Sequence, residues 1–374
     1  MNKTDILIIG GGIIGLSVAI ELRLCGAAVT VLSRNFKQAA AHAAAGMLAP
    51  QAEALSSGAM LDLCLRSRSL YPDWTHKLEI MTGIDTGYWP CGILAPAFAE
   101  DIKNGLTPPD QCQLLPSSPW LDQAAIQQHQ PGLSPKVVGG WWFPEDAQVD
   151  NRALAQVLWA AATQLGVNLC EGVPVEAIHH QHGRVIGVEA LLGEWQAEQY
   201  VLATGAWSAE LLPVPVSPRK GQMLSVQASP FEGTAQPLQQ VLFGSQIYIV
   251  PRQDGRIVIG ATVEDVGFTP SNTPAGIQTL LREAIALYPC LQDFPVQEFW
   301  WGFRPATPDE CPILGLSPYD NLIIATGHYR NGILLAPVTA KLLSDLIVHR
   351  KVDPLLAHFD WQRFTNTNDR LSMS

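Results

Sequence analysis

The segment Ile6-Leu7-Ile8-Ile9-Gly10-Gly11-Gly12-Ile13-Ile14-Gly15 decides how this chain folds. Its four leading apolar residues predict a short buried strand, and the glycine turn leads into a helical pattern of apolar residues. In the spacing Gly-x-Gly-x-x-Gly, Gly10 permits the tight turn, Gly12 lets a pyrophosphate approach the backbone, and Gly15 lets helix and strand pack closely. The phosphates would lie over the positive N-terminus of the helix. We interpret the segment as a dinucleotide cradle, against the alternative of a plain tight turn.

A second apolar segment, from Val29 to Leu32, completes the start of a βαβ unit after the helix ends at Gly26. An acidic residue usually follows this strand and binds the ribose hydroxyls, but Ser33 occupies the position. Ser33 can still form a hydrogen bond to a ribose hydroxyl, as a neutral and therefore weaker partner. The pair Ser33-Arg34 also suits the 2′-phosphate of NADP. The cradle alone therefore leaves the nucleotide open.

Composition excludes several classes of partner. The 374 residues are 47% hydrophobic and 15% charged, which is enough for two domains with sizeable cores. The net charge of -11 argues against nucleic acid and against an anionic membrane surface. We expect a cytoplasmic protein without a leader segment or membrane insertion, because no run of 18 apolar residues is present.

Cysteine and histidine patterns give no sign of a metal site. The seven cysteines form no Cys-x-x-Cys pair, so we expect reduced, mostly buried thiols. The tract His179-His180-x-His182 resembles a metal-binding tract, but its position beside Gly183 favours a solvated loop between short strands. We therefore predict no bound metal.

The composition and the hydrophobic pattern of the sequence change several times along the chain. These changes predict an α/β protein whose nucleotide-binding domain is interrupted by a second, strand-rich domain. Residues 151–165 form a clear amphipathic helix that Asp150 can cap, and the strands ending at Thr204-Gly205 and at Thr326 bring ligand-binding loops to one sheet edge. The expected nucleotide-binding domain comprises residues 1–80, 145–215 and 302–365, the second domain residues 81–144 and 216–301, and the polar tail residues 366–374.

Five stretches together resemble the glycine oxidases, which belong to the D-amino-acid oxidase and sarcosine oxidase group of flavoproteins. The resemblance runs in order from about residue 4 to about residue 350, and its last stretch is the most specific. The five stretches are Gly10 to Gly15, Ala43-Ala44-Ala45-Gly46-Met47-Leu48, Tyr248-Ile249-Val250-Pro251-Arg252, Gly302-Phe303-Arg304-Pro305-Ala306-Thr307 and Gly327-His328-Tyr329-Arg330-Asn331-Gly332-Ile333-Leu334-Leu335-Ala336-Pro337.

The resemblance implies FAD rather than NADP, in a Rossmann-like FAD-binding domain with an interleaved antiparallel-sheet substrate domain. The sarcosine oxidase branch attaches its flavin to a cysteine that aligns near Gly302, so we expect FAD to be bound non-covalently; Cys311 lies too far along the chain. The expected cofactor-binding residues are Gly10, Gly12, Ile13, Ile14, Gly15, Ser33, Arg34, Ala40, Ala41, Ala45, Gly46, Met47, Val175, Thr204, Gly205, Gly302, His328, Tyr329, Arg330, Asn331, Gly332, Ile333 and Leu334.

The resemblance also assigns Arg304 and Arg330 to a substrate carboxylate, with Tyr248 closing the same end. Physical chemistry agrees, because a guanidinium binds a carboxylate through two hydrogen bonds and a tyrosine hydroxyl adds a neutral donor. Gln246 and Val263 stand where a related bacterial enzyme has histidine and methionine, so we expect them at the amine end of the pocket. The three residues Tyr248, Arg304 and Arg330 are the expected catalytic set.

The activity implied is oxidative deamination of glycine, and of sarcosine and small D-amino acids, by hydride transfer to flavin N5. The products are an oxo acid, ammonia and hydrogen peroxide, and the role implied is in making the thiazole of thiamine. Two alternatives stay open: a dehydrogenase that passes electrons to a quinone or carrier, and a non-catalytic flavin-binding subunit. Enzymes of this kind are commonly homo-oligomers, often tetramers, so we expect an oligomer that takes a small amino acid and oxygen.

Overall fold

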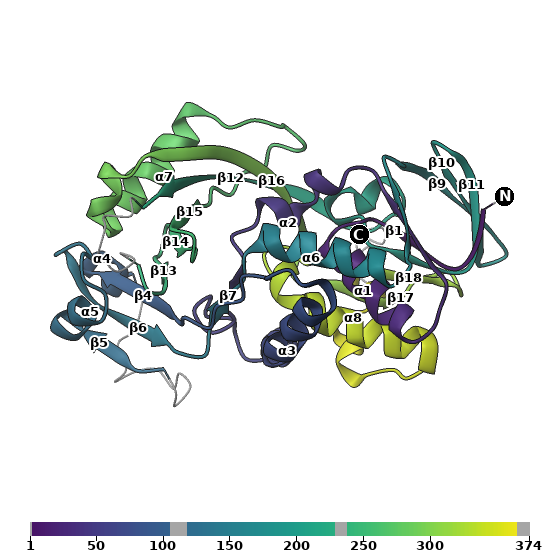
Figure 1. Ribbon diagram of the computed structural model, residues 1–374, viewed down its shortest axis with the longest axis horizontal. Coiled ribbons are helices and arrows are strands. Elements are labelled where there is room, and N and C mark those ends of the chain that lie inside the picture. The colour runs from purple at the N-terminus through teal and green to yellow at the C-terminus, as the bar shows by residue number, and fades with distance from the viewer. Residues whose placement is uncertain (1, 105–117, 229–237, 365–374) are drawn as a thin grey trace, which may run out of the picture.

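The computed structural model describes residues 2–104, 118–228 and 238–364, so the predicted polar tail at 366–374 lies outside the described residues. Figure 1 shows two lobes side by side, and each lobe is built around one eight-stranded sheet. The chain passes between the lobes several times, because both sheets contain strands from distant parts of the sequence. The predicted α/β architecture, with a Rossmann-like sheet and an antiparallel second sheet, is confirmed.

The first sheet has a parallel centre with the strand order β17-β18-β11-β1-β2-β8. Residues Ile6 to Ile9 are buried, as expected of a strand covered on both faces. β17 pairs antiparallel to β18, and β9 and β10 extend from β11 as an antiparallel meander. The strands are β1 (Asn2–Ile9), β2 (Val29–Ser33), β8 (Asn168–Glu171), β9 (Val175–Gln181), β10 (Arg184–Ala190), β11 (Gly193–Leu202), β17 (Ile313–Leu316) and β18 (Leu322–Thr326).

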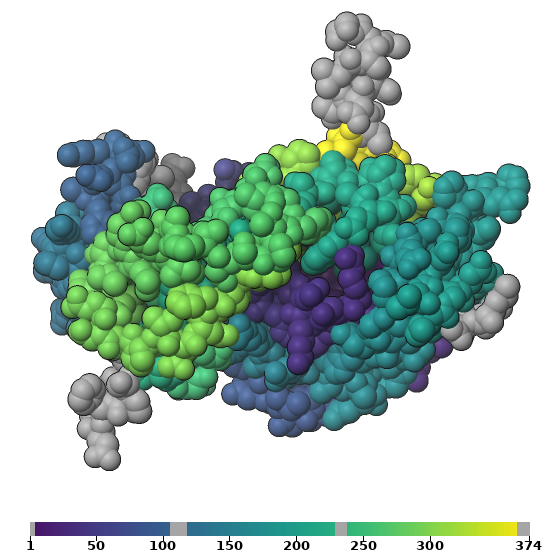
Figure 2. Space-filling view, turned by 90° about the horizontal axis from the view of Figure 1, so that it is seen from above, coloured from purple at the N-terminus to yellow at the C-terminus, as the bar shows by residue number. Residues whose placement is uncertain are grey.

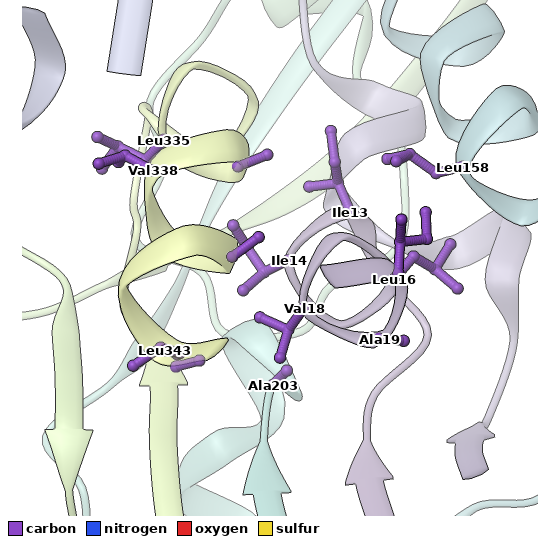
Figure 3. Packing of buried hydrophobic residues seen from close by; sticks show 14 of the residues in the cluster. Ile13, Ile14, Leu16, Val18, Ala19, Leu158, Ala203, Leu335, Val338 and Leu343 are labelled. Carbon is purple, nitrogen blue, oxygen red and sulfur yellow. The ribbon is translucent and has the colours of Figure 1, made fainter. Parts of the chain in front are cut away.

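Helices α1, α6 and α8 cover one face of this sheet, and together with α3, which packs on α6 and α8, they form the largest apolar core. Figure 3 shows side chains of α1, among them Ile14 and Val18, between Leu335 and Leu343 of α8 on one side and Leu158 of α6 on the other. The helices are α1 (Ile13–Leu24), α3 (Ala59–Thr82), α6 (Asn151–Gln164) and α8 (Gly332–His349).

Helix α8 is held in the core by α3. Pro337 lies inside α8 and has no N–H for the carbonyl of Ile333, and the Tyr71 hydroxyl of α3 donates to that carbonyl at 2.5 Å. By length and composition alone, α8 is long and apolar enough to cross a membrane, with a mean hydropathy of 1.4. Two thirds of it, 67%, is buried inside the protein, which is the environment of a core helix.

The second sheet has the order β16-β12-β15-β14-β13-β4-β6-β5 and is antiparallel apart from the β13–β4 pair. Helix α7 (Pro274–Leu287) packs on one face, and the other face turns its apolar residues towards the first lobe. The strands are β4 (Ile93–Phe98), β5 (Trp120–Asp122), β6 (Val137–Phe143), β12 (Ser217–Gln227), β13 (Val241–Phe243), β14 (Tyr248–Pro251), β15 (Arg256–Gly260) and β16 (Val296–Ala306).

Short elements connect the lobes and complete the surface. The pair β3 (Met47–Leu48) and β7 (Ala147–Gln148) forms a small separate sheet at the junction, and α2 (Ala40–Ala43) lies near β16. Helices α4 (Ala99–Lys103) and α5 (Gln123–His129) belong to the second lobe. Short 3-10 turns lie at Phe36–Gln38, Gly205–Glu210, Pro289–Asp293, Pro354–His358 and Trp361–Phe364.

Three details differ from the expectations or refine them. His179 and His180 lie in β9 rather than in a loop, and His182 occupies the turn with φ of +50°. Among the six described cysteines, all free, Cys64 alone is buried, so the thiols are less buried than expected; Cys112 lies outside the described residues. β16 stays in the second sheet to Ala306, and the predicted domain boundaries stay predictions.

Candidate active site

An open cavity lies between the two lobes. Figure 2 shows the dark purple N-terminal segment at the bottom of a hollow between the green and teal parts of the surface. The cavity is lined by the β1–α1 turn, by residues 38–47, by parts of β14 and β16, and by the loop before α8. One cavity therefore contains both the predicted cradle and the predicted substrate residues.

The three cradle glycines differ in how much space surrounds them. Gly10 has φ of +117°, and a Cβ there would lie 2.3 Å from the carbonyl oxygen of Ala203. A Cβ on Gly15 would lie 1.9 Å from the carbonyl oxygen of Gly10. A Cβ on Gly12 would meet only the Ala39 Cβ, at 3.8 Å, so the space in front of Gly12 stays open for a ligand. Two glycines thus serve the fold and one serves the ligand.

Two long helices, α1 and α8, begin at this cavity without a side-chain cap. The N-cap residues Gly12 of α1 and Asn331 of α8 make no side-chain hydrogen bond to the first turn, whereas Asp150 and Thr273 cap α6 and α7. The short helix α2 also begins at the cavity without a side-chain cap, at Ala39, whereas the uncapped helix α3 begins away from the cavity. The first backbone N–H groups of α1 and α8 can therefore serve anionic groups of a bound ligand.

The small residues at 43–47 are fixed from behind. Gly46 has φ of +75°, and its carbonyl accepts a hydrogen bond from Val149 at 2.9 Å. The buried Arg252 guanidinium donates to the Ala45 carbonyl at 2.7 Å and to Asn151 at 3.1 Å. Burial lowers the pKa of Arg252 to about 10, and nearby Asp150 opposes that shift. The cavity side of this segment is lined by alanine, glycine and methionine, an apolar surface that fits the face of a planar ring system.

Arg34 and Glu210 form an ion pair in the part of the cavity that Ser33 lines. Ser33 is buried and lines the cavity, while Arg34 pairs with Glu210 at 3.2 Å and lies over the Trp207 ring at 5.2 Å. Glu210 also lines the cavity and would repel a 2′-phosphate. This arrangement disfavours NADP, the alternative that the Ser33-Arg34 pair left open.

Tyr248 and Arg304 reach the opposite end of the cavity because glycines lie beside them. A Cβ on Gly221, which pairs with Gly302 across β12 and β16, would lie 2.6 Å from the guanidinium nitrogens of Arg304. A Cβ on Gly260, which pairs with Tyr248 across β14 and β15, would lie 2.9 Å from the Tyr248 hydroxyl. Burial raises the pKa of Tyr248, so its hydroxyl keeps its proton and can donate it in a hydrogen bond.

A buried polar network holds the Arg304 side chain. The guanidinium donates to the Thr262 carbonyl at 3.1 Å, and the Thr262 hydroxyl donates to Glu264 at 2.5 Å. Lys220, which is 2% exposed, pairs with Glu264 at 2.9 Å, and Gln222 donates to the same carboxylate at 2.7 Å. The segment that carries the Thr262 carbonyl is therefore tied to β12.

Arg330 is paired with an acidic side chain. Its guanidinium lies 3.4 Å from Glu53, whose side chain is 12% exposed. Burial raises the pKa of the Glu53 carboxyl above its usual range, and the guanidinium groups of Arg330 and Arg304 oppose this shift. Burial disfavours the charge on Arg330, but Glu53 together with Tyr248, Tyr329 and Glu310 outweighs that effect and holds the pKa of Arg330 above its usual value. The cationic end of the cavity thus contains one carboxylate.

His328 is a buried neutral residue in the loop before α8. Burial lowers its pKa to about 3, and its Nε2 lies 3.2 Å from the Thr339 hydroxyl. The histidine also lines the cavity. It therefore contributes a hydrogen-bonding group without a charge.

The cavity brings together most of the residues predicted from the sequence. Gly15, Asn331 and Leu334 do not line it: Gly15 packs against Gly10, Asn331 is the N-cap of α8, and Leu334 is in the core. Gln246 and Val263 do not line it either, because both side chains point to solvent. Those that do line it are Gly10, Gly12, Ile13, Ile14, Ser33, Arg34, Ala40, Ala41, Ala45, Gly46, Met47, Val175, Thr204, Gly205, Tyr248, Gly302, Arg304, His328, Tyr329, Arg330, Gly332 and Ile333.

Sequence reasoning missed several lining residues with distinct chemistry, namely Glu53, Trp207, Glu210, Gly221, Met223 and Phe303. Glu53 had a signal, because it is the one acidic residue in the alanine-rich stretch 36–60. The others come from strands and turns whose partners only the tertiary fold reveals. No group of three or more His, Cys, Asp or Glu side chains suited to a metal ion occurs in residues 2–104, 118–228 and 238–364.

Comparisons with known proteins agree with this geometry. The model of the FAD dependent oxidoreductase family matches residues 5–346. Bifunctional protein ThiO/ThiG of Trichormus variabilis is 64% identical over 96% of this chain, which spans only 55% of that relative. Glycine oxidase of Bacillus licheniformis is 33% identical, covering 94% of this chain and 95% of that protein. The crystal structure of glycine oxidase from Geobacillus kaustophilus superposes with a TM-score of 0.88 at 32% identity, covering 97% of this chain and 99% of that one.

Proposed function

This chain belongs to the family of FAD-dependent oxidoreductases, and from that premise we propose that it oxidises glycine and other small amino acids with oxygen. FAD is the cofactor of the family, and the cavity fits it through the open space at Gly12, the uncapped starts of α1 and α8, and the narrow segment at Ala45. The products proposed are an oxo acid, ammonia and hydrogen peroxide. Sarcosine and small D-amino acids are proposed as further substrates.

One observation carries the proposal: Tyr248 and Arg304 line the same cavity as the glycine cradle. A guanidinium and a protonated phenol together form a site for a carboxylate. The carboxylate thus has a place at one end of the cavity, while the cradle occupies the other. Arg330 adds positive charge at the carboxylate end.

The role of the protein residues is to position the substrate. Arg304 and Tyr248 hold the carboxylate, which fixes the α-carbon and replaces a bimolecular encounter by a prearranged one. Bound FAD supplies the two-electron acceptor for the hydride of the α-carbon and the reaction with oxygen. Met223 is buried, its sulfur lies 4.0 Å from the Tyr248 hydroxyl, and its apolar side chain lines the cavity beside that residue and limits the access of water.

An anaerobic titration tests the function. Glycine, sarcosine and D-alanine are added in turn to the oxidised holoenzyme, and the absorbance of the flavin is followed. We expect bleaching by glycine, followed by recovery and one hydrogen peroxide per glycine when oxygen is admitted. Bleaching without peroxide formation would identify a dehydrogenase, and no bleaching by any amino acid would identify a flavin-binding subunit.

We also propose the setting in which the enzyme works. The resemblance to ThiO/ThiG and to glycine oxidases supports a role in making the thiazole of thiamine. We propose a cytoplasmic homo-oligomer, which sedimentation and cell fractionation would test.

A further inference from the structure

Glu53 lies at the end of a turn that is fixed from outside the cavity. The backbone N–H of Glu53 donates to the Ala49 carbonyl at 3.0 Å, and the N–H of Ala52 donates to the buried Asp146 at 2.8 Å. Arg68 in turn donates to Asp146 at 2.6 Å. These contacts hold the turn in one conformation, so the Glu53 carboxylate has a defined place at the cationic end of the cavity.

The charges at this end do not balance without a ligand. Arg304 and Arg330 contribute two positive charges, and Glu53 contributes one negative charge. A substrate carboxylate with a neutral amine restores neutrality, whereas the zwitterion leaves one positive charge. The charged and titratable groups that face Glu53 are Arg330 from the loop before α8, Arg304 from β16, Tyr248 from β14, Glu310 from the turn after β16 and Cys64 from α3.

Glu53 is only partly engaged by Arg330. The contact joins one carboxylate oxygen, Oε1, to one guanidinium nitrogen at 3.4 Å, which is long for a charged hydrogen bond. In the part of the chain that the structure describes, the second oxygen, Oε2, has no hydrogen-bond partner. In the proposed site the arginines bind the carboxylate of the substrate. The Glu53 carboxylate is then free to bind the amino group of the same molecule.

We infer that Glu53 recognises the amino group of the substrate and accepts its proton, an inference that rests on the proposed oxidation of amino acids. A free amino acid carries its nitrogen as ammonium, which has no electron pair to support departure of a hydride. In the step proposed, one N–H bond of the ammonium breaks and an O–H bond forms on Glu53. The electron pair stays on the nitrogen, and the proton passes from Glu53 to water before the next turnover.

Burial of Glu53 supports this role, because a buried carboxyl holds a proton more readily than an exposed one. The competing explanation is that Glu53 merely holds Arg330 in place. That explanation predicts equal losses for ligands with and without an amino group. The role proposed here predicts losses for amines alone.

The experiment uses the holoenzyme, the variant Glu53→Gln and the control Glu310→Gln. Glu310 is exposed and does not line the cavity, so its substitution removes a nearby negative charge without touching the site. Flavin reduction by glycine and D-alanine is measured by anaerobic rapid mixing between about pH 6 and about pH 10. Binding of glycolate and acetate, which lack an amino group, is measured from the perturbation of the flavin spectrum.

For Glu53→Gln we expect flavin reduction at neutral pH to slow by about 100-fold. The rate should then rise by about tenfold per pH unit towards the pKa of the substrate ammonium, because only free amine can react. Affinity for glycolate and acetate should change by less than about threefold, and Glu310→Gln should match the wild type in both measurements.

Equal weakening of glycine and acetate binding in Glu53→Gln, or an unchanged pH profile, would overturn the inference and leave Glu53 as a partner of Arg330. Failure of wild-type flavin to be reduced by glycine would overturn the proposed function together with this inference. The two failures are therefore distinguishable.

Discussion

One end of the cavity is formed by backbone groups and the other by side chains. The cradle end consists of glycines and of helix starts without side-chain caps, so its contacts are backbone N–H groups and open space. The substrate end consists of side chains, with Glu53, Tyr248, Arg304 and Arg330 supplied by four separate parts of the chain. Substitutions should therefore damage folding and cofactor binding at the first end, and damage turnover while sparing the fold at the second.

The substitution Gly10→Ala should have the largest effect, because a Cβ would lie 2.3 Å from the Ala203 carbonyl oxygen at a φ of +117°. We expect the free energy of unfolding to fall by roughly 3 kcal/mol or more, with loss of bound flavin. Urea unfolding of the apoprotein and the ratio of flavin to protein measure the two effects.

Gly12→Ala is the matched control at the same end. Its Cβ would meet only Ala39 at 3.8 Å, so the apoprotein should unfold close to the wild-type urea concentration while flavin binding weakens. Equal destabilisation of the two apoproteins would contradict the assignment of Gly10 to the fold and Gly12 to the ligand.

At the substrate end, Arg304→Ala should lower kcat/KM for glycine by about 1000-fold, equivalent to about 4 kcal/mol, because the carboxylate loses its charged partner. The flavin content should not change. Steady-state kinetics and the flavin spectrum check both statements.

Arg219→Ala is the control, since Arg219 pairs in register with Arg304 on the adjacent strand but pairs with Asp265 and does not line the cavity. A similar loss of kcat/KM in the two variants would show that general charge, and not contact with the substrate, is responsible.

His328 makes the loop before α8 sensitive to acid. Its pKa falls from the ordinary 6.5 to about 3 on burial, so the folded protein binds fewer protons than the unfolded chain between these values. Stability should therefore decrease as the pH falls below about 6.5, by about 1.4 kcal/mol per pH unit from this residue. Urea unfolding at several pH values measures the slope.

The slope should flatten in His328→Gln, which retains a hydrogen-bonding group near Thr339. The exposed His349 is the control position, and His349→Gln should leave the slope unchanged. A wild-type slope in His328→Gln would assign the acid sensitivity to other groups.

The smallest effect expected is that of Gly221→Ala. Its Cβ would lie 2.6 Å from the guanidinium nitrogens of Arg304, which form the movable end of a long side chain. We expect kcat/KM to fall by about tenfold, with a change in the free energy of unfolding of less than about 1 kcal/mol. A large loss of stability would mean that the substrate end also depends on glycine for its fold.

The same contrast decides what sequence could reveal. The cradle is local, so the roles of Gly10, Gly12 and Gly15 follow from one stretch of sequence and the geometry supports them. The local sequence also predicted Asp150 as the N-cap of α6. Its two hydrogen bonds to the first turn of that helix confirm the prediction. Local patterns carry these features because strand, turn and helix are contiguous.

The substrate end could be predicted only through a resemblance. Arg304 and Tyr248 do line the cavity, but Gln246 lies in the solvent-exposed turn before β14 and Val263 is 58% exposed. Position in a motif does not determine which way a side chain points, because strand register and turn geometry decide that. Glu53 stands out as the one acidic residue of the alanine-rich stretch, but only the tertiary fold shows that its turn faces the cavity.

Arg252 belongs to the hairpin of the second lobe, yet it grips the Ala45 carbonyl beside the cradle of the first. The guanidinium therefore joins two lobes that are built on separate sheets. Heating the protein should then produce a single calorimetric peak, with release of the yellow chromophore coinciding with collapse of both halves. Removing the Arg252 guanidinium should weaken this coupling, while the Arg256–Asp150 and Arg152–Glu298 ion pairs still join the lobes.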